Sequence, residues 1–324
     1  MTASQEVQRI RLAEKLRREL GPDVLKALSD PDVIEIILNP DGKIWLESHT
    51  QGMSDAGLSM KPAQAENLIG TVAAALNAVV NPQNPIIEGE LPLTGSRFEG
   101  LLPPITPSPC FVIRKRASVL YTLDDYVKDN IVTRGQAIAL RDAIVKRQNI
   151  VIAGGTGSGK TTLVNALIHE MVTLGHQAER FVIIEDTLEL QCAAQNALQL
   201  HTTDAADMTR LVRATMRLRP DRIIIGEVRG KEALALLKAW NTGHPGGVTT
   251  VHANSASAAL LRLLSLIEEA GVPAQPQLIA EAVNLLAFME RTSITGRRLT
   301  ELLHVEGYDQ RTGFELEPAI TERR

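Results

Sequence analysis

The chain has 324 residues, of which 44% are hydrophobic and 22% charged, and its formal net charge is −4 at pH 7. This composition is typical of a globular protein, and the length favours two domains. The acidic balance and the aromatic content of 3% argue against direct sequence-specific nucleic-acid binding, and two cysteines are too few for a zinc cluster.

The N-terminus has neither the basic nor the apolar region of a signal peptide. Residues 7–20 predict an amphipathic helix with five basic side chains. Such a helix either lies on anionic lipid or packs within a domain, because Glu14 and Glu19 interrupt its positive charge. Two cysteines without a C-x-x-C pair favour a reducing cytoplasm. No stretch is long and apolar enough to span a bilayer, so any membrane contact is expected to be peripheral.

The first third of the chain predicts a compact α+β domain. Two apolar runs, Val33–Leu38 and Lys43–Glu47, flank a turn, which is typical of a hairpin. Apolar residues recur at helical spacing over Ala63–Val80, and a proline-rich stretch precedes a strand at Phe111–Arg114. We therefore place an α+β N-terminal domain at 1–118, an interdomain linker at 119–135 and a second, larger domain at 136–324.

A glycine-rich loop at 154–161 matches the pattern G-x-x-x-x-G-K-[ST] at each fixed position. A short β-branched run precedes it and a helical pattern follows it, as the mechanism of a P-loop requires. Lys160 is predicted to reach the β- and γ-phosphates of a nucleoside triphosphate, and Thr161 to bind Mg²⁺. The complete set predicted to bind nucleotide here is Gly154, Gly155, Thr156, Gly157, Ser158, Gly159, Lys160, Thr161 and Thr162.

Downstream, short apolar strands alternate with helical segments, which predicts a parallel sheet flanked by helices. The strands Phe181–Ile184 and Ile223–Ile225 are followed by the acids Glu185 and Glu227. Because the carboxyl ends of parallel strands face the ligand, both acids are expected at one site. Their spacing alone does not tell which acid holds the metal and which positions water.

Two further patterns have more than one interpretation. His252 follows a third strand, Val248–Val251, and is either a structural histidine or a phosphate-proximal one. Arg210, Arg213 and Arg217 share one helical face, which is either solvated or supplies an arginine to a neighbouring subunit. The chain ends in a predicted antiparallel hairpin with a turn at Asp309–Gly313.

Four motifs in this order resemble the hexameric ATPases of the type II/IV secretion superfamily, most closely their conjugative-transfer TrbB branch. Residues 154–161 are similar to the Walker A motif and 185–190 to the Asp box. Residues 218–230 are similar to the atypical Walker B motif, and 243–253 to the His box.

This resemblance implies a RecA-like P-loop domain that uses ATP and Mg²⁺. It implies that Glu227 is the catalytic base, that Glu185 orients water or Mg²⁺, and that His252 senses the nucleotide. It also implies that Arg97 and Arg114 of the N-terminal domain close on the phosphates.

The resemblance further implies a homohexamer at the cytoplasmic face of the inner membrane, working with inner-membrane components of a secretion or conjugation machine. The expected function is an ATP-driven motor for type IV secretion, conjugative DNA transfer and pilus biogenesis. The alternatives are a pilus retraction or tight-adherence ATPase of the same superfamily and a nucleotide-gated assembly scaffold. A DNA helicase or translocase is disfavoured by the acidic charge and few aromatics.

Overall fold

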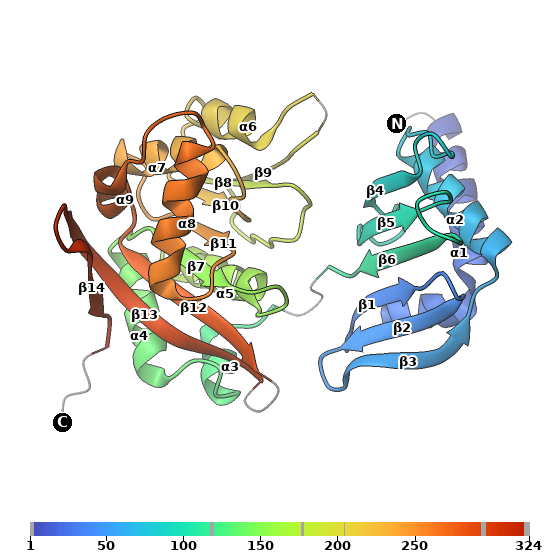
Figure 1. Cartoon of the computed structure of the whole chain (residues 1–324), viewed down its shortest axis with the longest axis horizontal. Helices are drawn as coiled ribbons and strands as arrows, with labels where there is room; N and C mark the ends of the chain where they lie inside the picture. The colour runs from blue at the N-terminus through green and yellow to red at the C-terminus, as the bar shows by residue number, and fades with distance from the viewer. Residues whose placement is uncertain (1–2, 117–119, 176–177, 204, 293–295, 321–324) are drawn as a thin grey trace. The chain divides into compact units, whose positions relative to one another are not determined.

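The computed structural model describes residues 3–116, 120–175, 178–203, 205–292 and 296–320. Its chain divides into two compact units, Met1–Val119 and Leu120–Arg324, and each is described by itself (Figure 1).

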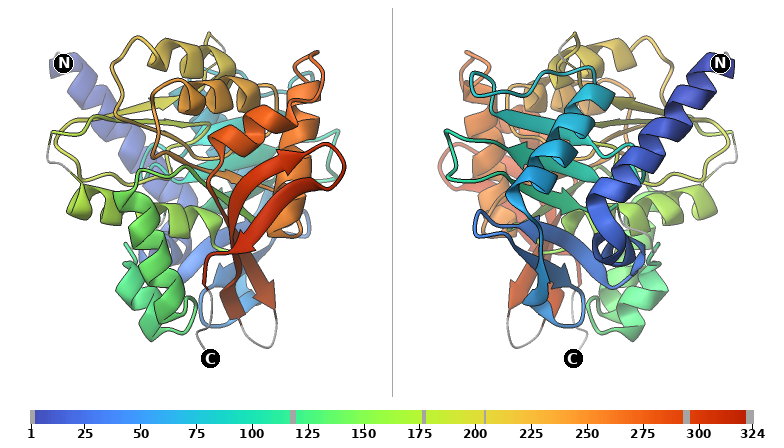
Figure 2. Two further views of the ribbon diagram at one scale, coloured as in Figure 1. Left: turned by 90° about the vertical axis from the view of Figure 1, so that its left-hand side faces the viewer. Right: turned by 90° about the vertical axis from the view of Figure 1, so that its right-hand side faces the viewer.

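The first unit is a six-stranded antiparallel sheet with two helices on one face. Figure 2 shows α1 and α2 lying across this sheet. Its strand order is β3-β2-β1-β6-β5-β4. The elements are α1 (Ala3–Ser29), β1 (Val33–Leu38), β2 (Lys43–Ser48), β3 (Gly52–Ser59), α2 (Pro62–Ala75), β4 (Ile86–Glu90), β5 (Arg97–Leu101) and β6 (Cys110–Arg114).

The predicted hairpin is formed by β1 and β2, and the predicted amphipathic helix lies within α1. Leu16 and Leu20 of that helix are buried in the core of the unit, which supports the packing interpretation for this part of α1. Val7 and Ile10, nearer the start of the same helix, are about half exposed. The α-helical path is interrupted at Gly21, whose φ of +78° lies in the left-handed region, immediately before a proline.

The second unit is a three-layer α/β/α structure. Its elements up to α6 are α3 (Leu123–Lys128), α4 (Arg134–Val145), β7 (Ile150–Gly154), α5 (Lys160–Leu174), β8 (Phe181–Glu185), β9 (Ala197–His201) and α6 (Met208–Thr215). The remaining elements are β10 (Arg222–Ile225), α7 (Glu232–Asn241), β11 (Val248–Val251), α8 (Ala256–Glu268), α9 (Pro276–Ala282), β12 (Leu285–Thr292), β13 (Gly296–Asp309) and β14 (Gly313–Pro318).

The sheet of this unit has the order β14-β13-β12-β7-β11-β10-β8-β9. The strands from β12 to β9 in this order pair in parallel, and β12, β13 and β14 pair antiparallel. One face is covered by α3, α4 and α5, and the other by α6, α7, α8 and α9. The central strands are buried on both faces, which is why they read as continuous apolar runs rather than as alternating patterns.

This topology places the ends of four strands at one edge of the sheet. β11 lies between β7, which leads into the P-loop, and β10, which leads to Glu227. β8, which ends at Glu185, lies on the other side of β10. The residues that follow these strands therefore meet at the carboxyl edge, where ligands of open α/β sheets bind.

The segment predicted to be an interdomain linker differs in the structure. Residues 120–135 belong to the second unit and contain α3 and the start of α4. Leu123 and Tyr126 of α3 are buried in the core beside α4 and α5. Capping boxes at Thr122 and Thr133 begin the two helices, so local side-chain hydrogen bonds and burial both fix this segment.

No helix in the described ranges combines the length and apolar character that crossing a membrane requires.

Candidate active site

Residues 154–161 run from the last residue of β7 through a tight loop to the second residue of α5. A Cβ at Gly154 would lie 2.4 Å from the backbone oxygen of Met289 on β12, so a larger residue would force the two strands apart. Gly159, the residue before α5, has a φ of +95°, which is costly for other residues. The loop thus leads directly into the N-terminus of a 15-residue helix, where backbone N–H groups attract anions.

Lys160 folds its side chain back over this loop. Its ammonium donates hydrogen bonds to the carbonyl oxygens of Gly154 at 2.8 Å and Gly155 at 2.9 Å. The residue is only 7% exposed, and its Nζ also lies 3.4 Å from Nδ1 of His252. A positive charge is therefore held at the centre of a cradle made of glycine backbone.

The hydroxyl groups of the loop differ in their surroundings. Thr156 is exposed, whereas Thr161 and Thr162 are half-buried in the first turn of α5. Ser158 is buried, and its hydroxyl has no hydrogen-bond partner among the described residues. A buried hydroxyl without a partner is costly, so the loop fits a ligand that offers hydrogen-bonding oxygens, as a phosphate does.

Glu185 is buried at the end of β8. Its Oε1 accepts hydrogen bonds from the backbone N–H groups of Glu189 and Leu190, both at 2.9 Å. Its Cγ lies 3.1 Å from the position that a Cβ on Gly226 would take, directly beside the residue that precedes Glu227. One carboxylate oxygen of Glu185 therefore fixes the loop after β8, while the side chain lies next to the second acid.

Glu227 follows β10 and makes two short contacts with donors. Its Oε2 accepts a hydrogen bond of 2.6 Å from Nη2 of Arg229, and its Oε1 lies 2.9 Å from Nε2 of His252. The side chain is 18% exposed. Arg229 is a site residue that the sequence analysis did not single out, although a basic residue two positions after a strand-end acid was a signal for it.

His252 connects the P-loop to the strand-end glutamate. Because an ammonium group can only donate, Nδ1 of the neutral ring faces Lys160 as an acceptor, and the ring proton is then on Nε2, facing Glu227. Burial lowers the pKa of His252 below 6.5, against an opposing effect of Glu227, and the charge of Lys160 lowers this pKa further. The ring is therefore neutral at pH 7 and has one acceptor and one donor at defined positions.

The strand that carries His252 is also tied to the loop of Glu227. The hydroxyl of Thr250 donates to the carbonyl oxygen of Gly226 at 2.8 Å, and the N–H of Val228 donates to the carbonyl oxygen of Thr250 at 3.0 Å. These bonds hold the residues on both sides of Glu227 against β11. The structure thus brings together Lys160, Glu185, Glu227 and His252 from four different elements.

Comparison with known proteins places the chain in a family. Residues 82–300 match the family model described as "Type II/IV secretion system protein". The chain belongs to this family. It is 56% identical to the conjugal transfer protein TrbB of Rhizobium radiobacter, over 92% of this chain and 91% of that protein. It is 30% identical to the type IV secretion system protein PtlH of Bordetella pertussis, over 86% of this chain and 92% of that protein.

Among solved structures, the Legionella pneumophila ATPase DotB is similar with a TM-score of 0.61 and 20% sequence identity. The match covers 89% of this chain and 80% of DotB. This level of identity supports the fold alone. The predicted fold class and the resemblance to the type II/IV secretion family are both confirmed.

Two predicted site residues of this family member lie in the first unit. Arg97 on β5 and Arg114 on β6 are directly opposite each other in the antiparallel sheet. Glu35 on β1 is opposite Arg114 in turn, with 3.6 Å between the nearest charged atoms. Two arginines in one cross-strand pair repel each other, and the carboxylate of Glu35 beside Arg114 offsets part of this repulsion. Their contact with nucleotide stays a prediction.

The arginine stripe predicted on one helical face is only partly helical, since α6 ends at Thr215. Arg210, Arg213 and Arg217 are all exposed in the single chain. Arg210 donates to the carbonyl oxygen of Ala205 within its own segment. This exposure fits the interpretation as a solvated face, and their contact with a neighbouring subunit stays a prediction.

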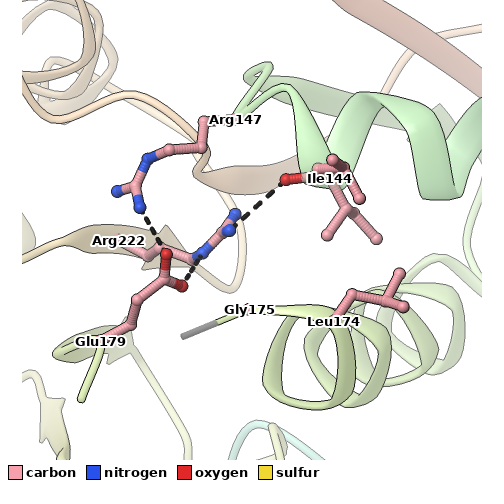
Figure 3. Close-up of a pocket in the computed structure, with 7 residues that line it drawn as sticks. Ile144, Arg147, Leu174, Gly175, Glu179 and Arg222 are labelled. Atoms are coloured by element: carbon pink, nitrogen blue, oxygen red, sulfur yellow. Dashed lines mark hydrogen bonds and ion pairs between the residues drawn. The ribbon is translucent and has the colours of Figure 1, made fainter. Parts of the chain in front are cut away.

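A buried ion-pair cluster lies at the opposite edge of the same sheet, where β8 and β10 begin (Figure 3). Arg222 is 2% exposed and donates to Glu179 at 2.7 Å and to the carbonyl oxygen of Gly246 at 3.0 Å. Glu179 also pairs with Arg147 at 2.5 Å. The cluster borders a cavity of about 170 Å³ between α4 and α5. Because its charged groups satisfy one another, we interpret it as a structural tie between strand beginnings.

Proposed function

We propose that this chain is the ATPase subunit of a conjugative type IV secretion machine, and that it binds and hydrolyses ATP in the second unit. The observation that carries the proposal is the series of contacts from the P-loop carbonyl oxygens through Lys160 and His252 to Glu227. It connects a phosphate-binding loop with a carboxylate at hydrogen-bonding distances. Membership of the type II/IV secretion family supports the same chemistry.

The P-loop would bind the triphosphate through its backbone N–H groups, Lys160 and the hydroxyls of the first turn of α5. Thr161 and Glu185 would hold Mg²⁺, which neutralises charge on the phosphate oxygens when bound. The described residues contain no group of three or more His, Cys, Asp or Glu side chains suited to a metal. This fits Mg²⁺, which is usually held by one or two protein oxygens together with phosphates and water.

Glu227 would accept the proton of the attacking water. Oε2 of Glu227 accepts a hydrogen bond from Arg229, and Nε2 of His252 lies 2.9 Å from Oε1, so the carboxylate has a donor group on each side of it. Such positioning is the main catalytic contribution of a protein to phosphoryl transfer. Arg97 and Arg114 would approach the phosphates from the first unit and bind their oxygens in the bidentate geometry of guanidinium groups.

The working form would be a homohexamer at the cytoplasmic face of the inner membrane, bound to inner-membrane components of the conjugation machine. Two observations support this: the family to which the chain belongs, and its 56% identity to a conjugal transfer protein. The proposal includes a peripheral contact with lipid, because the apolar side chains of Val7 and Ile10 on α1 are exposed.

The test is steady-state ATP hydrolysis by the purified chain, comparing Lys160→Ala with Lys238→Ala. Lys238 is an exposed residue in the last turn of α7 and serves as the matched control. We expect turnover to be lost in Lys160→Ala and retained in Lys238→Ala, because Lys160 is the ammonium group bound to the loop. Equal turnover in both variants would refute the P-loop assignment. A monomer with and without ATP and Mg²⁺, measured by mass, would refute the ring.

A further inference from the structure

Two arginines of the β12–β13 hairpin lie against the P-loop. Arg291 near the end of β12 and Arg297 near the start of β13 are opposite each other in the antiparallel ladder. β12 also pairs in parallel with β7, with Met289 opposite Gly154. A segment far downstream in the sequence thus brings two guanidinium groups to the glycine loop.

The contacts of these side chains are with the loop backbone. Nε of Arg297 donates a hydrogen bond of 3.1 Å to the carbonyl oxygen of Gly157. Its Cδ lies 3.2 Å from where a Cβ on Gly159 would be, and Nη1 of Arg291 lies 3.3 Å from where a Cβ on Gly157 would be. The glycines therefore serve a second purpose, because they leave room for the two arginine side chains.

The hairpin is firmly anchored close to Arg297. The backbone N–H of Leu299 donates to the carbonyl oxygen of Ile131 at 2.9 Å. Nε2 of Gln136 donates to the carbonyl oxygen of Leu299, also at 2.9 Å. Leu299 and Met289 are both buried. Because the backbone next to Arg297 is held by these hydrogen bonds, the Arg297 side chain can keep the glycine-rich loop in one position.

We propose that Arg297 is a positioning residue that holds the Gly157–Ser158 peptide in the orientation needed to bind phosphate. In a trans peptide the C=O and the following N–H point in opposite directions. Because Arg297 binds the Gly157 carbonyl oxygen, the N–H of Ser158 points away from Arg297. In the structure this N–H makes a long hydrogen bond of 3.4 Å to the carbonyl oxygen of Gly155, a bond that a phosphate oxygen would replace. The inference rests on the proposed function, since it assigns that N–H to a nucleotide phosphate. Arg291 adds a second positive charge at the same loop.

The loop needs such an external contact because of its composition. Gly157 has a φ of +70°, and glycines at 155 and 159 surround it, so the free loop has more backbone conformations than other sequences would have. Fixing a residue in one conformation costs entropy, and that cost falls on ligand binding if the loop is not already ordered. Arg297 orders the loop in advance, so its loss is expected to weaken binding rather than the chemical step.

The experiment measures ADP binding by titration calorimetry in Arg297→Ala, Arg297→Lys and Arg298→Ala, with Mg²⁺ present. Arg298 is the exposed neighbour in the same strand and makes the matched control. For Arg297→Ala we expect a Kd for ADP about tenfold higher, as for the loss of a charge-assisted hydrogen bond. KM for ATP should rise similarly, with kcat within about threefold. Arg297→Lys should recover most of the affinity.

Thermal unfolding without nucleotide separates positioning from a merely structural role. The Tm of Arg297→Ala should match that of Arg298→Ala, because the hairpin hydrogen bonds are backbone bonds and remain. Equal ADP affinity in Arg297→Ala and Arg298→Ala would overturn the positioning role, as would a lowered Tm and kcat with unchanged Kd. If the parent protein itself failed to bind ADP, the proposed function would be refuted rather than the role of Arg297 alone.

Discussion

Replacing Glu227 by glutamine tests the centre of the site with a minimal change in shape. The amide keeps the size of the carboxylate but is a far weaker proton acceptor. As general acid–base catalysis contributes roughly 10²–10⁴-fold, we expect kcat to fall at least about 100-fold, equivalent to about 2.7 kcal/mol in the activation free energy. ATP affinity should stay within about threefold, because Lys160 and the loop contacts are untouched.

The structure adds a second cost to this substitution. Glu227 faces a donor on each side, Nη2 of Arg229 at 2.6 Å and Nε2 of His252 at 2.9 Å. A glutamine has only one oxygen, so its NH₂ group must face one of these donors. We therefore expect His252 to change its orientation or tautomer in Glu227→Gln, visible as a shifted imidazole resonance in NMR.

The assay combines phosphate release over a series of ATP concentrations with direct measurement of ATP affinity. Glu268→Gln, an exposed position on α8, is the control and should keep the parent kcat. If Glu227→Gln retained kcat within about threefold, Glu227 would not be the base, and Glu185 would be the next residue to test.

The remaining predictions concern pH, stability and the first unit. Burial lowers the pKa of His252 in the folded protein. As pH falls below about 6.5, this histidine is therefore protonated in the unfolded chain before it is protonated in the folded one, and the folded state loses stability. His252→Asn should therefore lose less unfolding free energy than the parent between about pH 7 and 5, and an equal loss would contradict this. Arg222→Met removes the more deeply buried of the two arginine partners of Glu179 and leaves Arg147, so it should lower the unfolding free energy by about 1–3 kcal/mol in denaturant titrations. Arg97→Ala and Arg114→Ala should each lower turnover by about tenfold or more, whereas Arg18→Ala, at an exposed position, should not. Equal turnover in all three variants would confine the site to the second unit.

Local signals were enough to predict the P-loop and the strand-end acids. A β-branched run, glycines at fixed positions and a helical pattern occur within about 25 consecutive residues. Together they identify a strand, a phosphate-binding loop and a helix in the order that a P-loop requires. Glu185 and Glu227 stand at or just after the ends of buried parallel strands, and the apolar runs of these strands are visible in the sequence. That these ends meet at one edge follows from the rule for parallel sheets.

The parts that were missed depend on pairing between distant segments or on weak local patterns. β12 was not predicted because Leu285–Thr292 continues from a helical segment, and its place beside β7 is fixed by pairing across more than 130 residues. The contact of Arg297 with the loop follows only from that pairing. β4 and β5 are five residues each and lie in a stretch interrupted by proline and glycine. In the predicted linker, Leu123 and Tyr126 are three positions apart, a spacing too short to establish a helical period.

The strand order explains why the histidine is at the centre of the site. Since β11 lies between β7 and β10, a side chain that follows β11 is the one placed between the P-loop lysine and the glutamate. His252 contacts both, at 3.4 Å from Lys160 Nζ and 2.9 Å from Glu227 Oε1. A neutral imidazole carries one ring proton, on one nitrogen or the other, so the partner that Nδ1 binds decides whether Nε2 is the donor that faces Glu227. We therefore expect a movement of Lys160 on phosphate binding to be transmitted to Glu227 through this one ring, whose Nε2 lies 2.9 Å from Oε1 of Glu227.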